Sequence, residues 1–230
     1  MENNQLQALP EAIGNLSALR NINLKNNCLT HLPPSFGALP KLVYIGLSHN
    51  QLLALPSEIR GWQQLEDLSL DYNQLSALPK KLPYLPALYY LNLSHNQLQV
   101  LPNQLDRLPK LQFIYANHNQ LQRIPPSLGQ LPILKELRLH NNQLKALPKT
   151  LGQCTQLRYL HLHNNQLTRL PHSLGKAPLL EELRLQNNPL MALPASLHRH
   201  LKRLYLHHGQ WSPLRPHTPL QANGYDLILL

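Results

Sequence analysis

Residues 134–148 read LKELRLHNNQLKALP, and residues 157–171 read LRYLHLHNNQLTRLP. The two stretches begin 23 residues apart. Their first leucines belong to a series that keeps this spacing without a slip: Leu19, Leu42, Leu65, Leu88, Leu111, Leu134, Leu157 and Leu180. A period held this strictly indicates a repeat architecture, in which each unit is one supersecondary element. Positions in a unit are numbered from this leucine as position 1.

Apolar residues recur at positions 4 and 6 of each unit, as in Leu137 and Leu139. This alternation predicts a short strand with one face buried. Position 9 is always asparagine, whose amide can donate and accept hydrogen bonds at once. We therefore expect a structural ladder of amides that satisfies backbone groups of adjacent turns: Asn27, Asn50, Asn73, Asn96, Asn119, Asn142, Asn165 and Asn188.

Each unit continues with a step of the form L-x-x-L-P, from Leu6–Pro10 to Leu190–Pro194, with isoleucine at position 124 in one copy. Proline fixes φ and removes a backbone donor. The outer segments are therefore expected to be extended or short 3-10 turns, and long helices are disfavoured there.

The pattern L-x-x-L-x-L-x-x-N-x-L, followed by L-P-x-x-L-G-x-L, resembles the leucine-rich repeat over nearly the whole chain. It is similar to the 23-residue class of intracellular Ras-group leucine-rich repeat proteins. The resemblance implies a right-handed α/β solenoid, a horseshoe with a parallel β-sheet on the concave face and short 3-10 or extended segments on the convex face. It also implies a scaffold of signalling components. Stacked units would share one core, because no unit can bury its own leucines.

The predicted organisation is a solenoid over residues 1–214, with a partial first unit, eight regular 23-residue units and one degenerate last unit. At its end the step from Leu180 to Leu201 shortens to 21 residues, and the asparagine position becomes Gly209. Residues 215–230 are expected to form a capping tail, since solenoids need covered ends; a recognition peptide is the alternative. Because the chain opens in mid-unit, it is either a fragment of a longer protein or it tolerates an exposed edge.

The side chains at positions 3, 5, 7 and 8 are expected to point out from the concave face of the sheet. Six of the nine tyrosines occupy them, and tyrosine and arginine commonly anchor protein interfaces. The alternative is that tyrosine simply favours strands. We predict a non-enzymatic protein-binding module whose partner contacts lie on the concave face: Tyr44, Tyr72, Tyr90, Phe113, Tyr115, Arg138, His140, Tyr159, His161, His163, Arg184, Arg203 and Tyr205.

Charge differs between the two halves of the chain. Residues 1–115 hold eight Lys or Arg and seven Asp or Glu, a net +1, whereas residues 116–230 hold thirteen and four, a net +9. This basic half predicts a protein partner with an acidic surface. Nucleic-acid binding through the same half is an alternative, although Glu136, Glu181 and Glu182 interrupt the patch. A purely architectural or dimerising role is another, and the oligomeric state is left open.

Three histidines, His140, His161 and His163, fall on neighbouring outward positions and are a candidate zinc site. The alternative is that histidine belongs to the repeat pattern, where it contacts a partner or responds to pH. No glycine-rich phosphate loop, G-x-S-x-G or H-E-x-x-H motif is present. Asp67 and Asp71 share a face without an enclosing pocket, so general acid/base catalysis is not expected. We predict no enzyme activity and no cofactor.

The cysteines Cys28 and Cys154 lie about five repeats apart, which predicts that they do not pair. The cysteine-clustered caps of secreted relatives are missing, and neither end carries a targeting signal. The apolar run 227–230 is too short to span a bilayer. These features predict a cytoplasmic protein that makes no membrane contact.

Overall fold

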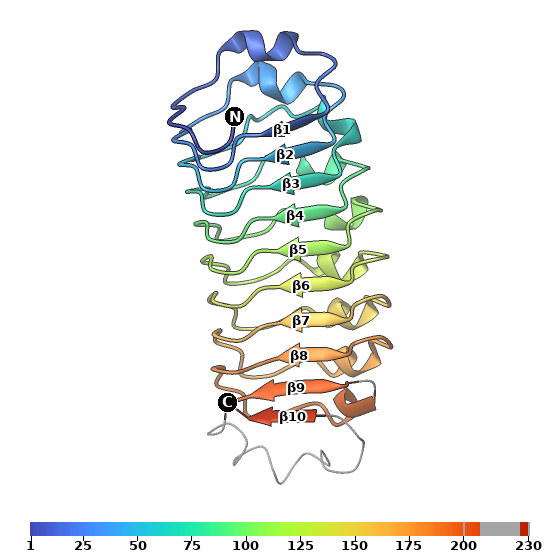
Figure 1. Ribbon diagram of the computed structural model, residues 1–230. Coiled ribbons are helices and arrows are strands. Elements are labelled where there is room, and N and C mark those ends of the chain that lie inside the picture. The colour runs from blue at the N-terminus through green and yellow to red at the C-terminus, as the bar shows by residue number, and fades with distance from the viewer. Residues whose placement is uncertain (200, 208–225, 230) are drawn as a thin grey trace.

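The computed structural model describes residues 1–199, 201–207 and 226–229, which form one stack of parallel strands (Figure 1). The sheet has ten strands, and each strand pairs with the next one in the sequence. The strands are β1 (Asn21–Asn23), β2 (Tyr44–Gly46), β3 (Asp67–Ser69), β4 (Tyr90–Asn92), β5 (Phe113–Tyr115), β6 (Glu136–Arg138), β7 (Tyr159–His161), β8 (Glu182–Arg184), β9 (Arg203–Leu206) and β10 (Asp226–Leu229). The predicted solenoid fold is confirmed.

The repeat period sets the strand register. From β1 to β8 each residue pairs with the one 23 positions later, as Leu137 does with Leu160. Between β8 and β9 the offset drops, so that Glu182 pairs with Arg203, which follows from the shortened last step. β10 pairs with β9. Gly209 and most of the predicted tail at 215–230 lie outside the described residues, and the capping role stays a prediction.

The leucines of all units share one core that extends from Leu9 to Leu206. Positions 1, 4 and 6 of a middle unit, Leu134, Leu137 and Leu139, are fully buried. Each buried aliphatic side chain contributes roughly 1.5–3 kcal/mol relative to its exposure to water. Because neighbouring units supply both walls of this core, stability accumulates along the stack.

The asparagines at position 9 link adjacent units through their buried amides. In Asn96, Oδ1 accepts a hydrogen bond from the backbone N–H of Leu75 at 2.9 Å, and Nδ2 donates to the carbonyls of Leu70 at 3.0 Å and Leu93 at 3.1 Å. The same bonds recur in the units before and after it. Backbone groups at the end of one strand are thus satisfied by the next unit.

Short 3-10 helices precede the strands and lie beside the sheet (Figure 1). Several begin directly after an extended proline, such as Pro148 with φ −67° and ψ 144°, so the expected short outer segments are confirmed. The 3-10 helices are η1 (Glu11–Asn15), η2 (Pro34–Ala38), η3 (Trp62–Gln64), η4 (Leu82–Tyr84), η5 (Leu105–Arg107), η6 (Pro126–Gln130), η7 (Lys149–Gln153), η8 (His172–Lys176) and η9 (Ala195–Arg199). No helix of the described residues is long and apolar enough to cross a membrane.

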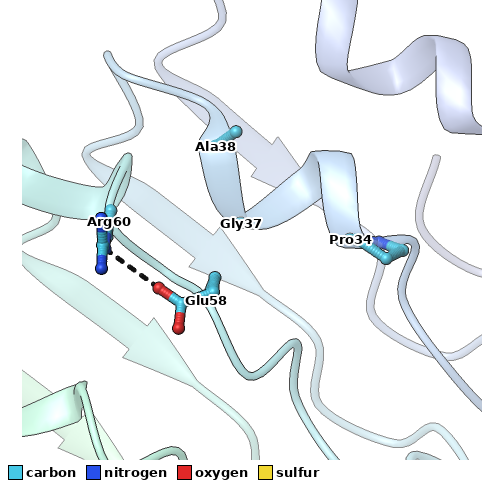
Figure 2. A pocket seen from close by; sticks show the side chains of 5 residues that line it. All are labelled: Pro34, Gly37, Ala38, Glu58 and Arg60. Carbon is cyan, nitrogen blue, oxygen red and sulfur yellow. Dashed lines mark ion pairs between the residues drawn. The ribbon is translucent and has the colours of Figure 1, made fainter.

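From η2 to η8 the length of these helices follows the residue at position 19, whereas η9 has five residues with His198 at this position. Units with glycine there have five-residue helices, as at Gly37 and Gly152. A Cβ on Gly152 would lie 1.9 Å from the carbonyl oxygen of Ser173 in the next unit, so only glycine allows the helices to stack this closely. Where Arg60 occupies this position, the helix η3 has three residues. A pocket lies between η2 and the segment that precedes η3, and Arg60 and Glu58 form an exposed ion pair at its edge (Figure 2).

Candidate functional site on the strand face

The strand face is defined here as positions 3, 5, 7 and 8 of the units that carry β1–β9. Successive strand residues point to opposite faces, so position 4 enters the core while positions 3 and 5 point outward. The register aligns position 3 in one row, which from β2 reads Tyr44, Asp67, Tyr90, Phe113, Glu136, Tyr159, Glu182 and Arg203. Position 5 forms a second row: Gly46, Ser69, Asn92, Tyr115, Arg138, His161, Arg184 and Tyr205.

All the residues predicted to contact a partner lie on this face. Tyr72 and Arg203 are exposed, and the others are partly buried by their neighbours. His140, His163 and Tyr72 lie just beyond the strand ends, at positions 7 and 8. The sheet therefore brings together side chains that are far apart in the sequence, and their role in partner binding stays a prediction.

Aromatic rings form a patch over β4 and β5. The rings of Tyr90 and Tyr115 meet edge to face with centroids 5.3 Å apart, and Phe113 lies 6.4 Å from Tyr90. Tyr89, at position 2, contacts Phe113 at 5.2 Å and extends the patch to the side. Tyr89 is absent from the set predicted from positions 3, 5, 7 and 8, although it directly precedes Tyr90 in the sequence. Edge-to-face contacts of this kind stabilise the rings in fixed orientations.

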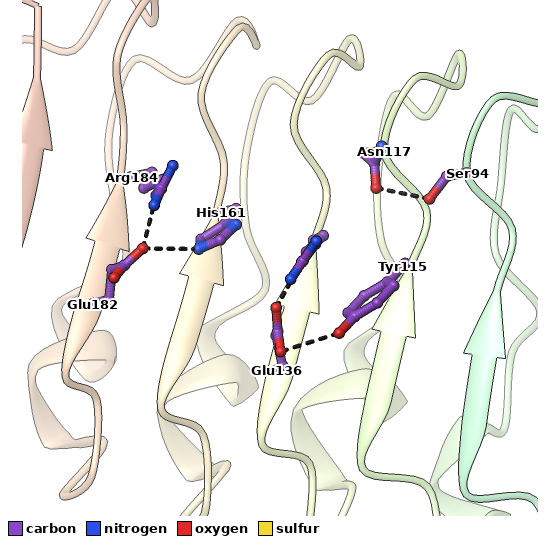
Figure 3. A network of polar contacts seen from close by, with 8 residues as sticks. Ser94, Tyr115, Asn117, Glu136, His161, Glu182 and Arg184 are labelled. Atoms are coloured by element: carbon purple, nitrogen blue, oxygen red, sulfur yellow. Dashed lines mark hydrogen bonds and ion pairs between the residues drawn. The ribbon is translucent and has the colours of Figure 1, made fainter. Parts of the chain in front are cut away.

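Glu136 on β6 holds Arg138 over the ring of Tyr115. The carboxylate accepts a hydrogen bond from Arg138 Nε at 2.6 Å and another from the Tyr115 hydroxyl at 3.1 Å (Figure 3). The guanidinium lies 4.2 Å from the centroid of the Tyr115 ring, which is a cation–π contact. Tyrosine, glutamate and arginine therefore form one rigid group across β5 and β6.

A second group of the same kind is built on β8 and β9. Glu182 accepts hydrogen bonds from Arg184 Nε at 2.7 Å and shares a contact of 3.1 Å with His161 Nε2 (Figure 3). Arg203 approaches its other oxygen at 3.0 Å, and Arg184 lies 4.6 Å from the ring centroid of Tyr205. The sequence Glu-Leu-Arg at 136–138 and 182–184 is the signal for both groups, and its glutamates were predicted only to interrupt the basic patch.

Glu182 is a buried charge whose neighbours compensate for its burial. The residue is only 3% exposed. Burial alone would raise the pKa of its carboxyl, but the hydrogen bond and the positive charge of Arg184, with the charge of Arg203, lower that pKa below its ordinary value. The carboxylate is therefore ionised at neutral pH and neutralises the arginines around it.

Asp67 on β3 differs from these glutamates. Its carboxylate accepts a hydrogen bond from the Ser69 hydroxyl at 3.0 Å, and none of the ion pairs in the described part of the chain involves it. Burial raises the pKa of Asp67 above its ordinary value. Asp71 on the same face accepts hydrogen bonds from Asn92 at 3.0 Å and from Ser48. The first half of the strand face is thus mildly acidic.

Position 8 has a backbone conformation that explains its composition. All eight residues there have φ between 53° and 55°, a left-handed conformation in which asparagine and histidine are enriched. The rings of His49, Tyr72, His95 and His118 stack on one another at 3.9–4.2 Å. The side-chain amides of Asn141, Asn164 and Asn187 continue the column by hydrogen bonds. The backbone conformation at position 8 therefore accounts for the column, which the sequence pattern alone did not predict.

The three histidines of the candidate zinc site are close but do not converge. His140 and His163 stack face to face at 4.3 Å, while His161 lies 6.3 Å from His140 and binds Glu182. Burial lowers the pKa of His140 to about 3 and that of His163 to about 4, so both rings are neutral at pH 7. Within the described residues no group of three or more His, Cys, Asp or Glu side chains is arranged to hold a metal ion, and the stack does not support the zinc site.

The defining pattern of the leucine rich repeat matches residues 1–52, 63–121 and 122–190 of this chain. The chain belongs to the leucine-rich repeat family. Domains of this family are generally non-catalytic and typically bind proteins. No match was found among curated protein sequences.

Solved structures show the same architecture. The leucine-rich repeat protein LIC12759 of Leptospira interrogans is 39% identical, with a TM-score of 0.78 over 82% of this chain and 48% of that one. The effector YopM of Yersinia pestis is 32% identical, with a TM-score of 0.72 over 88% and 52%. The plant peptide hormone receptor RGFR1, solved in complex with RGF2, is 28% identical, with a TM-score of 0.80 over 87% and 34%. The chain therefore spans about half the length of the Leptospira protein and about a third of the length of the receptor.

Proposed function

We propose that this leucine-rich repeat protein is a non-enzymatic binding module that engages a protein partner through the strand face. The observation that carries the proposal is the pair of groups Tyr115–Glu136–Arg138 and Glu182–Arg184–Tyr205 on either side of β7. Tyrosine and arginine are the residues that most often anchor interfaces. Here they are held in place before any partner arrives, which reduces the entropy lost on binding.

The comparisons support this use of the fold. The peptide hormone receptor RGFR1, which resembles 87% of this chain, was solved in complex with RGF2. We extend from that complex only the general idea that a leucine-rich repeat surface receives another polypeptide. The aromatic patch on β4 and β5 is the expected centre of such a contact, because apolar rings that lie together release water on binding.

The pairing of charges on the strand face indicates which chemistry a partner surface needs. From β6 to β9 the strand face has three arginines against two glutamates, and Arg138, Arg184 and Arg203 all pair with Glu136 or Glu182. The partner surface over these strands therefore needs little net charge, and it should offer aromatic and hydrogen-bonding groups. The same pairing weighs against a nucleic acid on this face, which would need free cations.

We also infer that the chain is of the 23-residue intracellular class and acts as a cytoplasmic scaffold in signal transduction. The regular 23-residue period supports the class. Cys28 and Cys154 are both free thiols, and burial raises the pKa of Cys154 to about 12. Free cysteines of this kind are typical of reducing compartments. Fractionation of the source cells with an antibody against the protein tests the location.

The proposal is tested with the double substitution Tyr115→Ala with Tyr159→Ala. Both rings lie on the strand face outside the core, so the circular dichroism spectrum should stay unchanged while partner capture from extracts of the source cells falls about tenfold or more. The matched control is Tyr84→Ala, since Tyr84 is 47% exposed on η4, away from the strand face. Equal capture by both variants would place the contact elsewhere on the molecule.

A further inference from the structure

The excess positive charge of the second half does not lie on the strand face. Of the net +9 in residues 116–230, the strand face from β6 to β9 accounts for one, as three arginines face two glutamates. Other cations, including Arg123, Lys145, Lys149 and Arg169, lie in the segments around the L-P steps that follow the asparagine ladder. All four side chains are exposed.

Around Lys149 and Arg169 these segments form two adjoining pockets that span three successive units. One hollow of about 540 Å³ is lined by Leu147, Lys149, Arg169 and Leu170 among others. A second hollow of about 420 Å³ shares Arg169 and Leu170 and continues to Met191. We call this surface, lined by Leu147, Lys149, Arg169, Leu170, His172 and Met191, the basic groove.

The groove combines an apolar floor with cations that lack counter-charges. Leu147 and Leu170 reach the surface only through a small part of their side chains, but Met191 is 64% exposed. In the described part of the chain, no ion pair involves Lys149 or Arg169. Between residues 116 and 207 the only acids are Glu136, Glu181 and Glu182, and all three are committed to arginine or lysine partners on the strand side.

We propose that the basic groove binds an extended acidic peptide segment of a protein partner, with carboxylates on Lys149 and Arg169 and apolar side chains over Leu170 and Met191. Charge complementarity with these two cations favours a negatively charged ligand. The apolar floor favours a peptide over a nucleic acid, because single-stranded nucleic acids need aromatic platforms on which bases stack. The segments 145–149, 168–172 and 191–194 contain no Phe, Tyr or Trp. This proposal is independent of what binds the strand face.

The experiment measures fluorescence anisotropy of a labelled short peptide in which Asp and Leu alternate, titrated with the full chain at low ionic strength. The double substitution Lys149→Gln with Arg169→Gln should weaken binding roughly tenfold, since two exposed charge contacts are removed. The control, Lys41→Gln with Lys110→Gln, removes the same charge from exposed side chains at position 23 of two units. It should leave the affinity within about twofold of the parent.

The apolar part of the proposal has its own matched pair. Met191→Gln should weaken binding several-fold, whereas Leu53→Gln should not. Leu53 occupies the same position 12 in the second regular unit and is 59% exposed, in a part of the chain without the excess cations. A peptide with Ser in place of Leu should bind more weakly to the parent chain, and a peptide with Lys in place of Asp should not bind.

Three results would overturn the proposal. One is no binding of the Asp-Leu peptide at low ionic strength. Another is binding that responds equally to the groove substitutions and to their controls, which would indicate a general charge effect. The third is tighter binding of an oligothymidylate than of the peptide, with loss on Lys149→Gln and Arg169→Gln, which would assign the groove to nucleic acid instead.

Discussion

The strand face and the basic groove treat charge in opposite ways. On the second half of the strand face the arginines are paired with glutamates at 2.6–3.0 Å, and the pairs are partly shielded from water. In the basic groove Lys149 and Arg169 are exposed to water and have no acid near them in the sequence. On the strand face the charges of the arginines are neutralised within the molecule, whereas the cations of the basic groove are free to pair with acidic groups of a partner.

This difference shows why net charge is a poor guide to the binding surface of a repeat protein. A net charge of +9 in the second half predicted a partner with an acidic surface, but the period places Glu and Arg on adjacent outward positions of the same strand, where they neutralise each other. The loops carry no such constraint. The position of a charge within the unit therefore matters more than its sign in the total.

The largest expected effect comes from removing the carboxylate that completes the strand face. Glu182→Gln leaves Arg184 and Arg203 without their counter-charge in a partly buried site, so the free energy of unfolding should fall by about 2–3 kcal/mol. Urea denaturation followed by circular dichroism measures it. The control is Glu181→Gln, one residue earlier, where the pairs with Arg158 and Lys202 are more exposed. That change should cost less than about 1 kcal/mol, and equal losses would contradict a special role for Glu182.

How much of this could be read from the sequence depends on the part of the molecule. The leucine period and the asparagine at position 9 predicted the fold, because each unit repeats the same contacts with its neighbour. The helix lengths were less obvious: from η2 to η8 they depend on whether position 19 is a glycine such as Gly152, and this matters only once units are stacked. Contacts between neighbouring strands, such as Arg138 over Tyr115, join residues one unit apart. They can be predicted only when the strand register is known.

The candidate site was predictable as a set of residues and not as a set of interactions. The alternation placed Tyr115, Arg138 and His163 on the outward face, and the structure has them there. The pairing of His140 with His163 as a stack, and of Arg184 with Glu182, depends on side-chain conformations that spacing does not specify. The sequence showed only that histidine recurs at position 8. The left-handed backbone conformation there explains this recurrence, because it restricts which residues are tolerated.

Acid should destabilise the strand face before the groove. His140 and His163 have pKa values lowered to about 3 and about 4, mainly by burial. The charge of His163 adds to the effect on His140, and the charge of His161 adds to the effect on both. The unfolded chain therefore takes up protons first as the pH falls. Stability is complete above about pH 6.5 and declines from there to about pH 4, by roughly 1 kcal/mol per pH unit for each ring.

Thermal unfolding measured across this pH range tests the effect. The variant His140→Gln with His163→Gln should have a flatter profile than the parent. The matched control is His172→Gln in the basic groove, whose side chain is already exposed to water, and its profile should follow that of the parent. A parent profile that is flat between about pH 6.5 and 4 would show that the stacked rings accept protons without cost.

The smallest effect is expected in the basic groove, and its sign should be reversed. Lys149→Gln with Arg169→Gln removes like charges that face only water, so the free energy of unfolding should change by less than about 0.5 kcal/mol and should rise slightly at low salt. At 1 M salt the screening length falls to about 3 Å, and the gain should vanish. The loss in Glu182→Gln should persist at the same salt, because buried pairs are screened much less. Melting temperatures of the two variants at low and high salt therefore separate a surface whose charges stabilise the fold from one whose charges are free for a ligand, and a groove variant that loses stability at both salts would show that its cations already have a structural role.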